Sequence, residues 1–508
     1  MIVLLLLNKV AVEPWIGRKI ETKFNEKAQD YILKIGNLHF TLIGPMIELD
    51  SISLFSVAQK KGVPELKGEI AFIKLKGINL TKILFHQDID IGEVVISNTN
   101  LKGEIKFLEK TRPAIISTIN LRIDSILFDN IDLAIQNKSN AGAYYVNKGI
   151  LKLLGLQIEK QDTLKANIVK QLDFVADEFN SVSADSMYTF KTNGVVCSST
   201  SKRLIIDRLS VQPNYKDSEF SARHEFAIDR FEAVFKNIFV RDFSPSLYIN
   251  SSKLISSYVE IGNMEMDVFR DTRKKIHHVK KAAFQDMIYN FPGDISIDSI
   301  GILSGNIIYT EHAKMATEAG TISFNELNAK LYKITNDTIF KTEKAYLKLN
   351  AQGRLMNKSR INISLKSRLF DPNNTFSLSG SLSGMNVDIL NPMLEKNAFI
   401  YARAGKIDKM NFSFTADNAR ASGKMILLYH GLNIAVKNKR TDDTMALKER
   451  VTSIIANIII LDSNPLPTKG VREGIIDYKR DPERFVFNYC AKSILSGIKS
   501  SLIKSPKK

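Results

Sequence analysis

The sequence contains almost no cysteine. Its 508 residues include two, Cys197 and Cys490, which lie far apart and form no Cys-x-x-Cys pair. With so few thiols, a disulfide framework and a zinc ribbon are both excluded. The cysteine count leaves the redox compartment open.

Motifs of common catalytic sites are also missing. There is no glycine-rich phosphate loop of the Walker or dinucleotide type, and His224-Glu225 has no second histidine at the spacing of a zinc protease. The adjacent His277 and His278 are surrounded by Lys and Arg, which oppose metal binding. We therefore predict that the protein is not an enzyme and has no catalytic residues, no metal and no cofactor.

No apolar run is long enough to span a bilayer. A spanning helix needs about 20 apolar residues, whereas the run at 2–7 is soon interrupted by polar residues and has no basic region before it. Our hypothesis is that Met1 falls inside a truncated membrane helix, with Trp15 and Arg18 at the membrane interface. The alternative is a short buried N-terminal helix.

Acidic residues are too few to balance the basic ones. The 71 Lys and Arg against 54 Asp and Glu give a net charge of +17, which attracts nucleic acid, phosphate-bearing lipid and acidic glycans alike. The basic residues are spread along the chain, with the densest run at 270–281. A nucleic-acid surface would concentrate them on one face with interleaved aromatics, so we predict no nucleic-acid partner.

From residue 32 on, the sequence is rich in segments with an apolar residue at every second position. Residues two apart in a strand share a face, so each segment has one apolar and one polar face. Short turn-forming clusters between the segments favour antiparallel pairing. The predicted fold class is mainly β: an elongated, curled antiparallel sheet with an N-terminal helix and C-terminal amphipathic helices.

Breaks in this pattern predict five regions. They are a membrane-proximal helix at 1–31, a first β part at 32–270, a basic loop or short helix at 271–295, a second β part at 296–440, and a helical and strand cap at 441–508.

Two helices are predicted within this cap. The apolar spacing of residues 447–458 fits one helix face, and Ile494, Leu495, Ile498 and Leu502 form the apolar side of a last helix. Because lysines flank this side, the last helix either lies on an anionic membrane or covers the end of the sheet. The sequence leaves both alternatives open.

A long antiparallel sheet must cover its apolar face. Because few helices are predicted, either the sheet closes on itself, or it curls into a groove in which lipid acyl chains form the missing layer. Such burial stabilises by about 25 cal/mol per Å² without directional contacts. The predicted groove-lining residues are Leu121, Ile123, Phe128, Ile131, Leu133, Ile135, Leu347, Leu349, Ile361, Ile363, Met410, Phe412 and Phe414.

These observations predict a passive lipid-binding protein. Acyl chains would lie along the inward side chains, and cations at the rim would attract anionic headgroups. A structural or protein-interaction module with a closed sheet and no lipid cargo is the alternative. An enzyme whose site carries no recognisable motif is a third.

The opening of the chain resembles that of AsmA-like envelope proteins, and later segments are similar to AsmA-like proteins of the Bacteroidota. The residues that carry the resemblance are 14–16, 18–20, 34–40, 309–313, 320–329, 421–429, 464–465, 484–489 and 495–499. These are strand and turn signatures without a chemical centre, so no catalytic residue is transferred.

The resemblance implies an inner-membrane anchor and a periplasmic β-groove in a Gram-negative-type bacterium. It implies phospholipid or another acyl lipid as ligand, and a role in lipid transport or outer-membrane homeostasis and assembly. The expected partners are the membrane, contacted by the N-terminal helix and in one alternative by the C-terminal helix, and an envelope protein. The chain departs from the family in its shortened N-terminal anchor.

Overall fold

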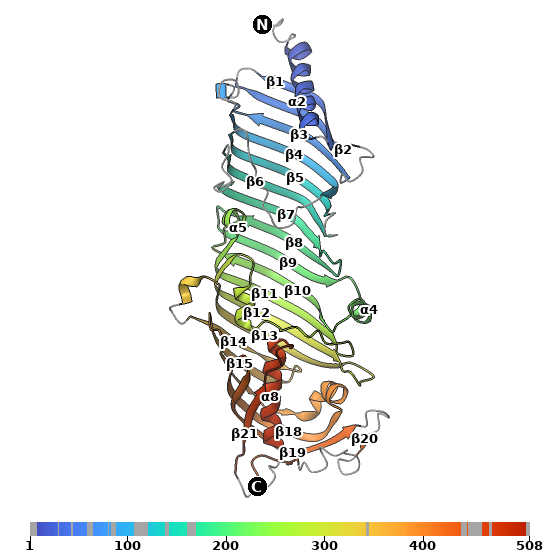
Figure 1. The fold of residues 1–508 in the computed structure, drawn as a ribbon, viewed down its shortest axis with the longest axis vertical. Helices are drawn as coiled ribbons and strands as arrows, with labels where there is room; N and C mark the ends of the chain where they lie inside the picture. Colours follow the sequence, from blue (N-terminus) through green and yellow to red (C-terminus); the bar gives the residue numbers. More distant parts are fainter. Residues whose placement is uncertain are drawn as a thin grey trace. The chain divides into compact units, whose positions relative to one another are not determined.

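The computed structural model confirms that the protein is mainly β (Figure 1). Wherever the register between neighbouring strands is defined, the strands run antiparallel, except for one parallel pair. Among the described residues, no strand pairing closes the sheet on itself. The described residues are 8–28, 30–41, 44–57, 65–79, 81–82, 88–105, 120–137, 142–159, 169–341, 345–437, 444–445, 460–466 and 470–503.

The chain forms two compact units. The N-terminal unit consists of Met1–Asn214 and Asn237–Leu254, and the C-terminal unit of Tyr215–Lys236 and Ile255–Lys508. The basic segment that we expected to divide the two β parts therefore lies within the C-terminal unit.

The N-terminal unit begins with a π-helical turn, η1 (Asn8–Val12), and the helix α2 (Glu13–Lys27), and it also holds the short helix α5 (Pro245–Ser251). The predicted apolar run at 2–7 lies outside the described residues. The strands are β1 (Tyr31–Thr41), β2 (Met46–Ser56), β3 (Leu66–Lys76), β4 (Ile89–Ile105), β5 (Leu121–Asn137), β6 (Ala143–Ile158), β7 (Gln171–Val182), β8 (Tyr188–Ser198) and β9 (Arg203–Pro213).

Two strands, β10 (Asp229–Arg241) and β11 (Lys253–Asp271), contain residues of both units. The helices of the C-terminal unit are α4 (Asp217–Ala222), α6 (Phe284–Tyr289), η2 (Thr338–Lys341), η3 (Val387–Leu390), α7 (Asn391–Met393), η4 (Leu394–Ala398) and α8 (Val486–Leu502). Its further strands are β12 (Asp294–His312), β13 (Gly320–Thr335), β14 (Tyr346–Leu355), β15 (Ser359–Arg368), β16 (Phe376–Leu382), β17 (Met385–Asn386), β18 (Ile400–Ala416), β19 (Arg420–Lys437), β20 (Thr444–Met445) and β21 (Glu473–Lys479).

The parallel pair β4–β5 contains matched bulges. Asn98 in β4 and Asn130 in β5 both have positive φ, at 53° and 55°, and the Asn130 side chain donates to Asn98 Oδ1 at 2.7 Å. Each bulge adds one residue to the period-two pattern, so that Phe128 and Ile131 lie on the same face although they are three apart. Asparagine tolerates this left-handed conformation better than other non-glycine residues.

One edge of β1, the first strand of the N-terminal unit, is covered by the helix α2. The Glu13, Glu21 and Asn25 side chains of α2 accept hydrogen bonds from backbone N–H groups of β1, at 3.1, 2.6 and 2.8 Å respectively. Figure 1 shows α2 lying along the first strands. Since an unpaired strand edge invites pairing with another chain, α2 protects this edge.

The C-terminal unit protects its last strand in the same way. Ser500 and Ser496 of α8 accept hydrogen bonds from the N–H groups of Ile475 and Asp477 in β21, at 3.0 and 3.1 Å. A Cβ atom on Gly474 would approach the Gly497 carbonyl oxygen to 2.6 Å, so glycine permits the close contact.

The last predicted helix, α8, therefore packs on the sheet and covers its last strand. Its residues Val486, Tyr489, Ile494, Ile498 and Leu502 pack against the hydrophobic core of the C-terminal unit. The helix predicted at 447–458 lies outside the described residues. Within the described part of the chain, no helix combines the length and apolar character needed to cross a bilayer.

Candidate functional site

The most distinctive surface of the N-terminal unit is the apolar face of its sheet. The strand registers align apolar residues into rows that cross the strands. One row consists of Leu38, Leu49, Ile73, Ile96, Phe128, Leu151, Phe174, Cys197 and Leu204, one residue from each of β1 to β9. Nine strands at about 4.8 Å spacing give this row a length of roughly 38 Å.

Two further rows run beside the first. One contains Ile47, Leu75, Val94, Ile126, Leu153 and Leu172. The other contains Leu33, Leu54, Gly68, Leu101, Leu133, Val146, Phe179, Thr192 and Leu209. We call the surface formed by the three rows the N-terminal apolar face.

All six groove residues predicted in β5 belong to this side of the sheet. Ile123, Ile131 and Ile135 are buried, whereas Leu121, Phe128 and Leu133 are half-buried. The structure therefore brings this group together as expected from its alternation.

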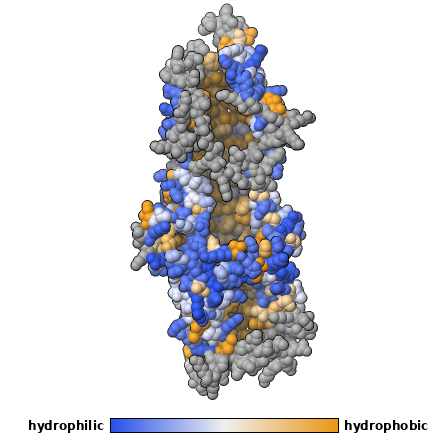
Figure 2. Space-filling view, viewed as in Figure 1, coloured by the Kyte–Doolittle hydropathy of each residue, from blue (hydrophilic) through white to orange (hydrophobic). Residues whose placement is uncertain are grey.

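Part of the N-terminal apolar face is open to solvent. Ile16 and Ile20 of α2 pack on the first strands, against a core that contains Leu38, Leu49 and Ile52. Farther along the same side, Tyr144 and Phe190 are 40% and 37% exposed. Figure 2 shows a hollowed hydrophobic surface over the strands of this unit.

Tyr144 and Phe190 were not among the predicted residues. Their register partners are Ile135 and Val211, which place them at the same side of the sheet. The sequence does indicate the face of Tyr144, because Tyr144 alternates with Val146. It does not indicate that the two aromatic rings are exposed.

The predicted groove residues of the C-terminal unit lie in a different environment. Phe412 and Phe414 are 4% and 2% exposed, and they share one core with Val486 and Tyr489 of α8. The same core includes Met410, with Leu349, Ile361 and Ile363 packed against it, and Leu347 is also buried. Here the protein's own helix occupies the position that we had assigned to lipid.

The predicted membrane-interface residues lie on the outer side of α2. Trp15 is 60% exposed and Arg18 is exposed. The Lys19 ammonium group lies 4.6 Å from the centroid of the Trp15 ring, in a cation–π contact. These side chains project from the side of α2 that does not pack on β1.

Polar side chains surround the edge of the N-terminal apolar face near Leu121. A depression of about 310 Å³ beside Leu121 is lined by Asp88, Asp90 and Arg122 among others. Lys82 forms an ion pair with Asp90 in this depression. The edge therefore carries both signs of charge next to an apolar surface.

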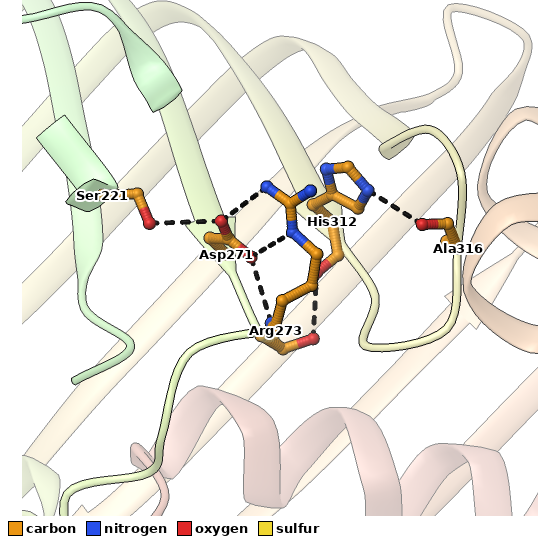
Figure 3. Close-up of polar contacts among 6 residues, drawn as sticks. Ser221, Asp271, Arg273, His312 and Ala316 are labelled. Carbon is orange, nitrogen blue, oxygen red and sulfur yellow. Dashed lines mark hydrogen bonds and ion pairs between the residues drawn. The ribbon is translucent and has the colours of Figure 1, made fainter. Parts of the chain in front are cut away.

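The C-terminal unit contains a polar constellation that invites comparison with a catalytic triad (Figure 3). Ser221 Oγ donates to Asp271 Oδ2 at 3.2 Å, and Arg273 donates to both carboxylate oxygens of Asp271, at 2.9 and 2.8 Å. The hydrogen bonds from the Arg273 side chain lower the pKa of Asp271 to about 2. The carboxylate is therefore held ionised.

This constellation does not form a nucleophile–base pair. The Nε2 atom of His312 bonds to the Ala316 carbonyl oxygen at 3.0 Å, and the hydroxyl of Ser221 is directed to Asp271 (Figure 3). Because a serine nucleophile needs a base within hydrogen-bond reach, the arrangement is structural: it joins α4 to the end of β11.

A depression of about 730 Å³ lies next to this constellation and includes Arg273 and His312 in its lining. Desolvation, followed by the charges of Glu232 and Glu265, raises the pKa of Asp267 there. The lining thus combines cations and carboxylates. Among the described residues, no group of three or more His, Cys, Asp or Glu side chains could hold a metal ion.

The sequence matches no protein-family model and none of the curated proteins. The assignment of a function therefore depends on the chemistry of the site.

Proposed function

We propose that this protein is a non-enzymatic lipid-handling protein that binds acyl chains of phospholipid, or of another acyl lipid, along the N-terminal apolar face. The observation that supports the proposal is the alignment of apolar side chains into rows across as many as nine strands. Part of this surface is exposed, at Tyr144 and Phe190.

The rows have the dimensions and chemistry that an acyl chain requires. Burial of a methylene group stabilises by about 0.8 kcal/mol, so ten methylene groups with half of their surface buried gain roughly 4 kcal/mol. The polar edge near Leu121 contains Lys82, paired with Asp90, and Arg122, paired with Asp124, so a headgroup there would meet charges of both signs.

The resemblance to AsmA-like proteins supports the setting that we propose. The protein would be attached to the inner membrane through its N-terminal segment, with its sheet in the periplasm, and would contribute to lipid transport or outer-membrane homeostasis. An envelope protein is the expected second partner.

Native mass spectrometry of protein purified without added lipid tests the proposal. We expect bound phospholipid at a defined stoichiometry. Leu133→Asp places a charge on the N-terminal apolar face and should abolish this binding. Leu127→Asp is the matched control, because Leu127 lies on the same strand, pairs with Lys152 on the opposite face, and is also half-buried.

Both variants should keep the β content of the wild type in circular dichroism. A folded wild-type protein with a lipid-free mass would refute the proposal, as would equal lipid loss in the two variants.

A second candidate function is a protein-interaction module. Ile150, Val175 and Val196 are register partners on the opposite face of the N-terminal sheet, and all three are exposed. Exposed apolar stripes of this kind mark binding surfaces. A lipid-free mass together with a stable complex lost on Val175→Asp would favour this alternative.

A further inference from the structure

The basic segment of the C-terminal unit is attached to the beginning of α8. His278 Nδ1 lies 2.7 Å from Glu483 Oε2, and the Lys281 N–H group donates to the Pro482 carbonyl oxygen at 2.8 Å. The Phe284 and Phe487 rings meet edge to face with centroids 5.5 Å apart. These contacts join two distant parts of the sequence into one surface, residues 273–289 and 483–487, which we call the basic–aromatic surface.

Large apolar side chains protrude from this surface. Phe487 is 68% exposed and Tyr289 is 57% exposed. Val279, Met287 and Phe485 are also exposed. A single exposed apolar residue needs no explanation, but several on one connected surface indicate a binding partner.

The same surface has a strong excess of positive charge. Its two segments together contain six Lys and Arg against two carboxylates, a local net charge of +4, although Arg273 is paired with Asp271, which lies just before the first segment. Neither Lys274, which is half-buried, nor Lys280, which is exposed, has an ion-pair partner within the described part of the chain, whereas Lys275 lies 3.5 Å from Glu225. The Lys281 ammonium group lies 5.3 Å from the Phe485 ring centroid, so one of these cations contacts an aromatic ring of the same surface.

Exposed cations next to protruding apolar side chains suit the interface of an anionic bilayer. Lysines attract the headgroups, while aromatic and aliphatic side chains enter the boundary between headgroups and acyl chains. Single-stranded nucleic acid would instead require a basic groove with rings on which bases stack. Val279 and Met287 have no stacking face, and this favours the bilayer.

We propose that the basic–aromatic surface binds the surface of an anionic lipid bilayer and thereby holds the C-terminal unit against a membrane. This binding does not depend on the N-terminal apolar face, because it involves lipid headgroups in an intact bilayer.

Flotation of the full chain with vesicles tests the proposal. Vesicles of equal parts phosphatidylcholine and phosphatidylglycerol should carry the protein, and vesicles of phosphatidylcholine alone should carry far less. Each lysine near an anionic surface contributes about a fivefold factor in affinity. The double variant Lys274→Glu/Lys280→Glu should therefore bind at least tenfold more weakly.

Matched controls separate this surface from the overall charge. Lys348→Glu/Lys358→Glu changes the net charge equally at two exposed lysines on other strands and turns, and it should bind like the wild type. Phe487→Ser should weaken binding, whereas Ile339→Ser, at a position that is also highly exposed, should not.

Equal binding of the two lysine double variants would overturn the proposal. So would a wild type that ignores the anionic vesicles but is retained by an oligonucleotide. Native mass spectrometry of bound lipid in each variant distinguishes this proposal from acyl-chain binding on the N-terminal apolar face. Loss of vesicle binding with retained bound phospholipid would support two separate sites, and vesicle binding by a lipid-free protein would support this surface alone.

Discussion

The contact between α2 and the edge of β1 leads to a prediction at single-residue resolution. Glu21 accepts a hydrogen bond from the Ile35 N–H group at 2.6 Å, fourteen residues along the chain. In Glu21→Ala this N–H group loses its acceptor, while the packing of Ile16 and Ile20 on the first strands remains. The variant therefore tests the hydrogen bond itself.

The expected magnitude follows from the charge of the acceptor. A hydrogen bond to an ionised group contributes about 1.5–3 kcal/mol. If the free energy of local opening at this edge falls by that amount, the exchange rate of the Ile35 amide should rise roughly 10- to 100-fold. The amides of Leu33 and Phe40, which bond to Asn25 and Glu13, should change less.

Hydrogen–deuterium exchange resolved to single amides measures this effect. Glu26→Ala is the matched control on the same helix, because the one polar contact of the Glu26 side chain among the described residues is an exposed ion pair with Lys23 at 3.1 Å. Such surface pairs contribute about 0.3–0.5 kcal/mol, so β1 should stay protected in this variant. Unchanged exchange at Ile35 in Glu21→Ala, or an equal rise in Glu26→Ala, would refute the reasoning.

Two further predictions concern Asp271 and Trp15. The Arg273 hydrogen bonds lower the folded-state pKa of Asp271 from 3.8 to about 2, so the ionised carboxylate stabilises the fold fully above pH ~4, and this stabilisation is lost as the pH falls towards 2. We expect it to add roughly 2 kcal/mol to the free energy of unfolding. In urea unfolding, the difference in this free energy between the wild type and Asp271→Asn should therefore shrink from pH ~4 to 2, and a difference that does not change with pH would contradict the prediction. Trp15 is the only tryptophan and is 60% exposed, so its emission should shift to the blue with anionic vesicles if α2 meets the membrane interface, and an unchanged spectrum would exclude that contact.

The class of the fold could be predicted because strand formation is encoded locally. In β5, apolar residues alternate with Arg122, Asp124 and Asp132, and this pattern alone distinguishes a half-buried strand from a helix. The two asparagines at the β4–β5 bulges show the same local logic, since Asn98 and Asn130 tolerate the positive φ that the bulges require.

The pairing of edges with helices could not be predicted. Nothing in the local sequence of α2 indicates that Glu13, Glu21 and Asn25 accept backbone hydrogen bonds from β1. Their spacing places them along one side of a helix, but charged residues on a helix face usually indicate solvent. The role of these side chains depends on an edge strand that only the folded sheet presents.

Between bulges, the sequence by itself determined which residues of a strand share the apolar face, because side chains there alternate with period two. The bulges at Asn98 and Asn130 shift this alternation by one residue. Only the tertiary structure decided whether that face is open or filled. Leu133 and Phe412 belong to equally regular alternations, yet Leu133 is half-buried on the N-terminal apolar face and Phe412 is buried under α8. The difference arises from Val486 and Tyr489, more than seventy residues after Phe412 in the chain. Burial depends on what packs against a face, and that partner is brought there by the fold.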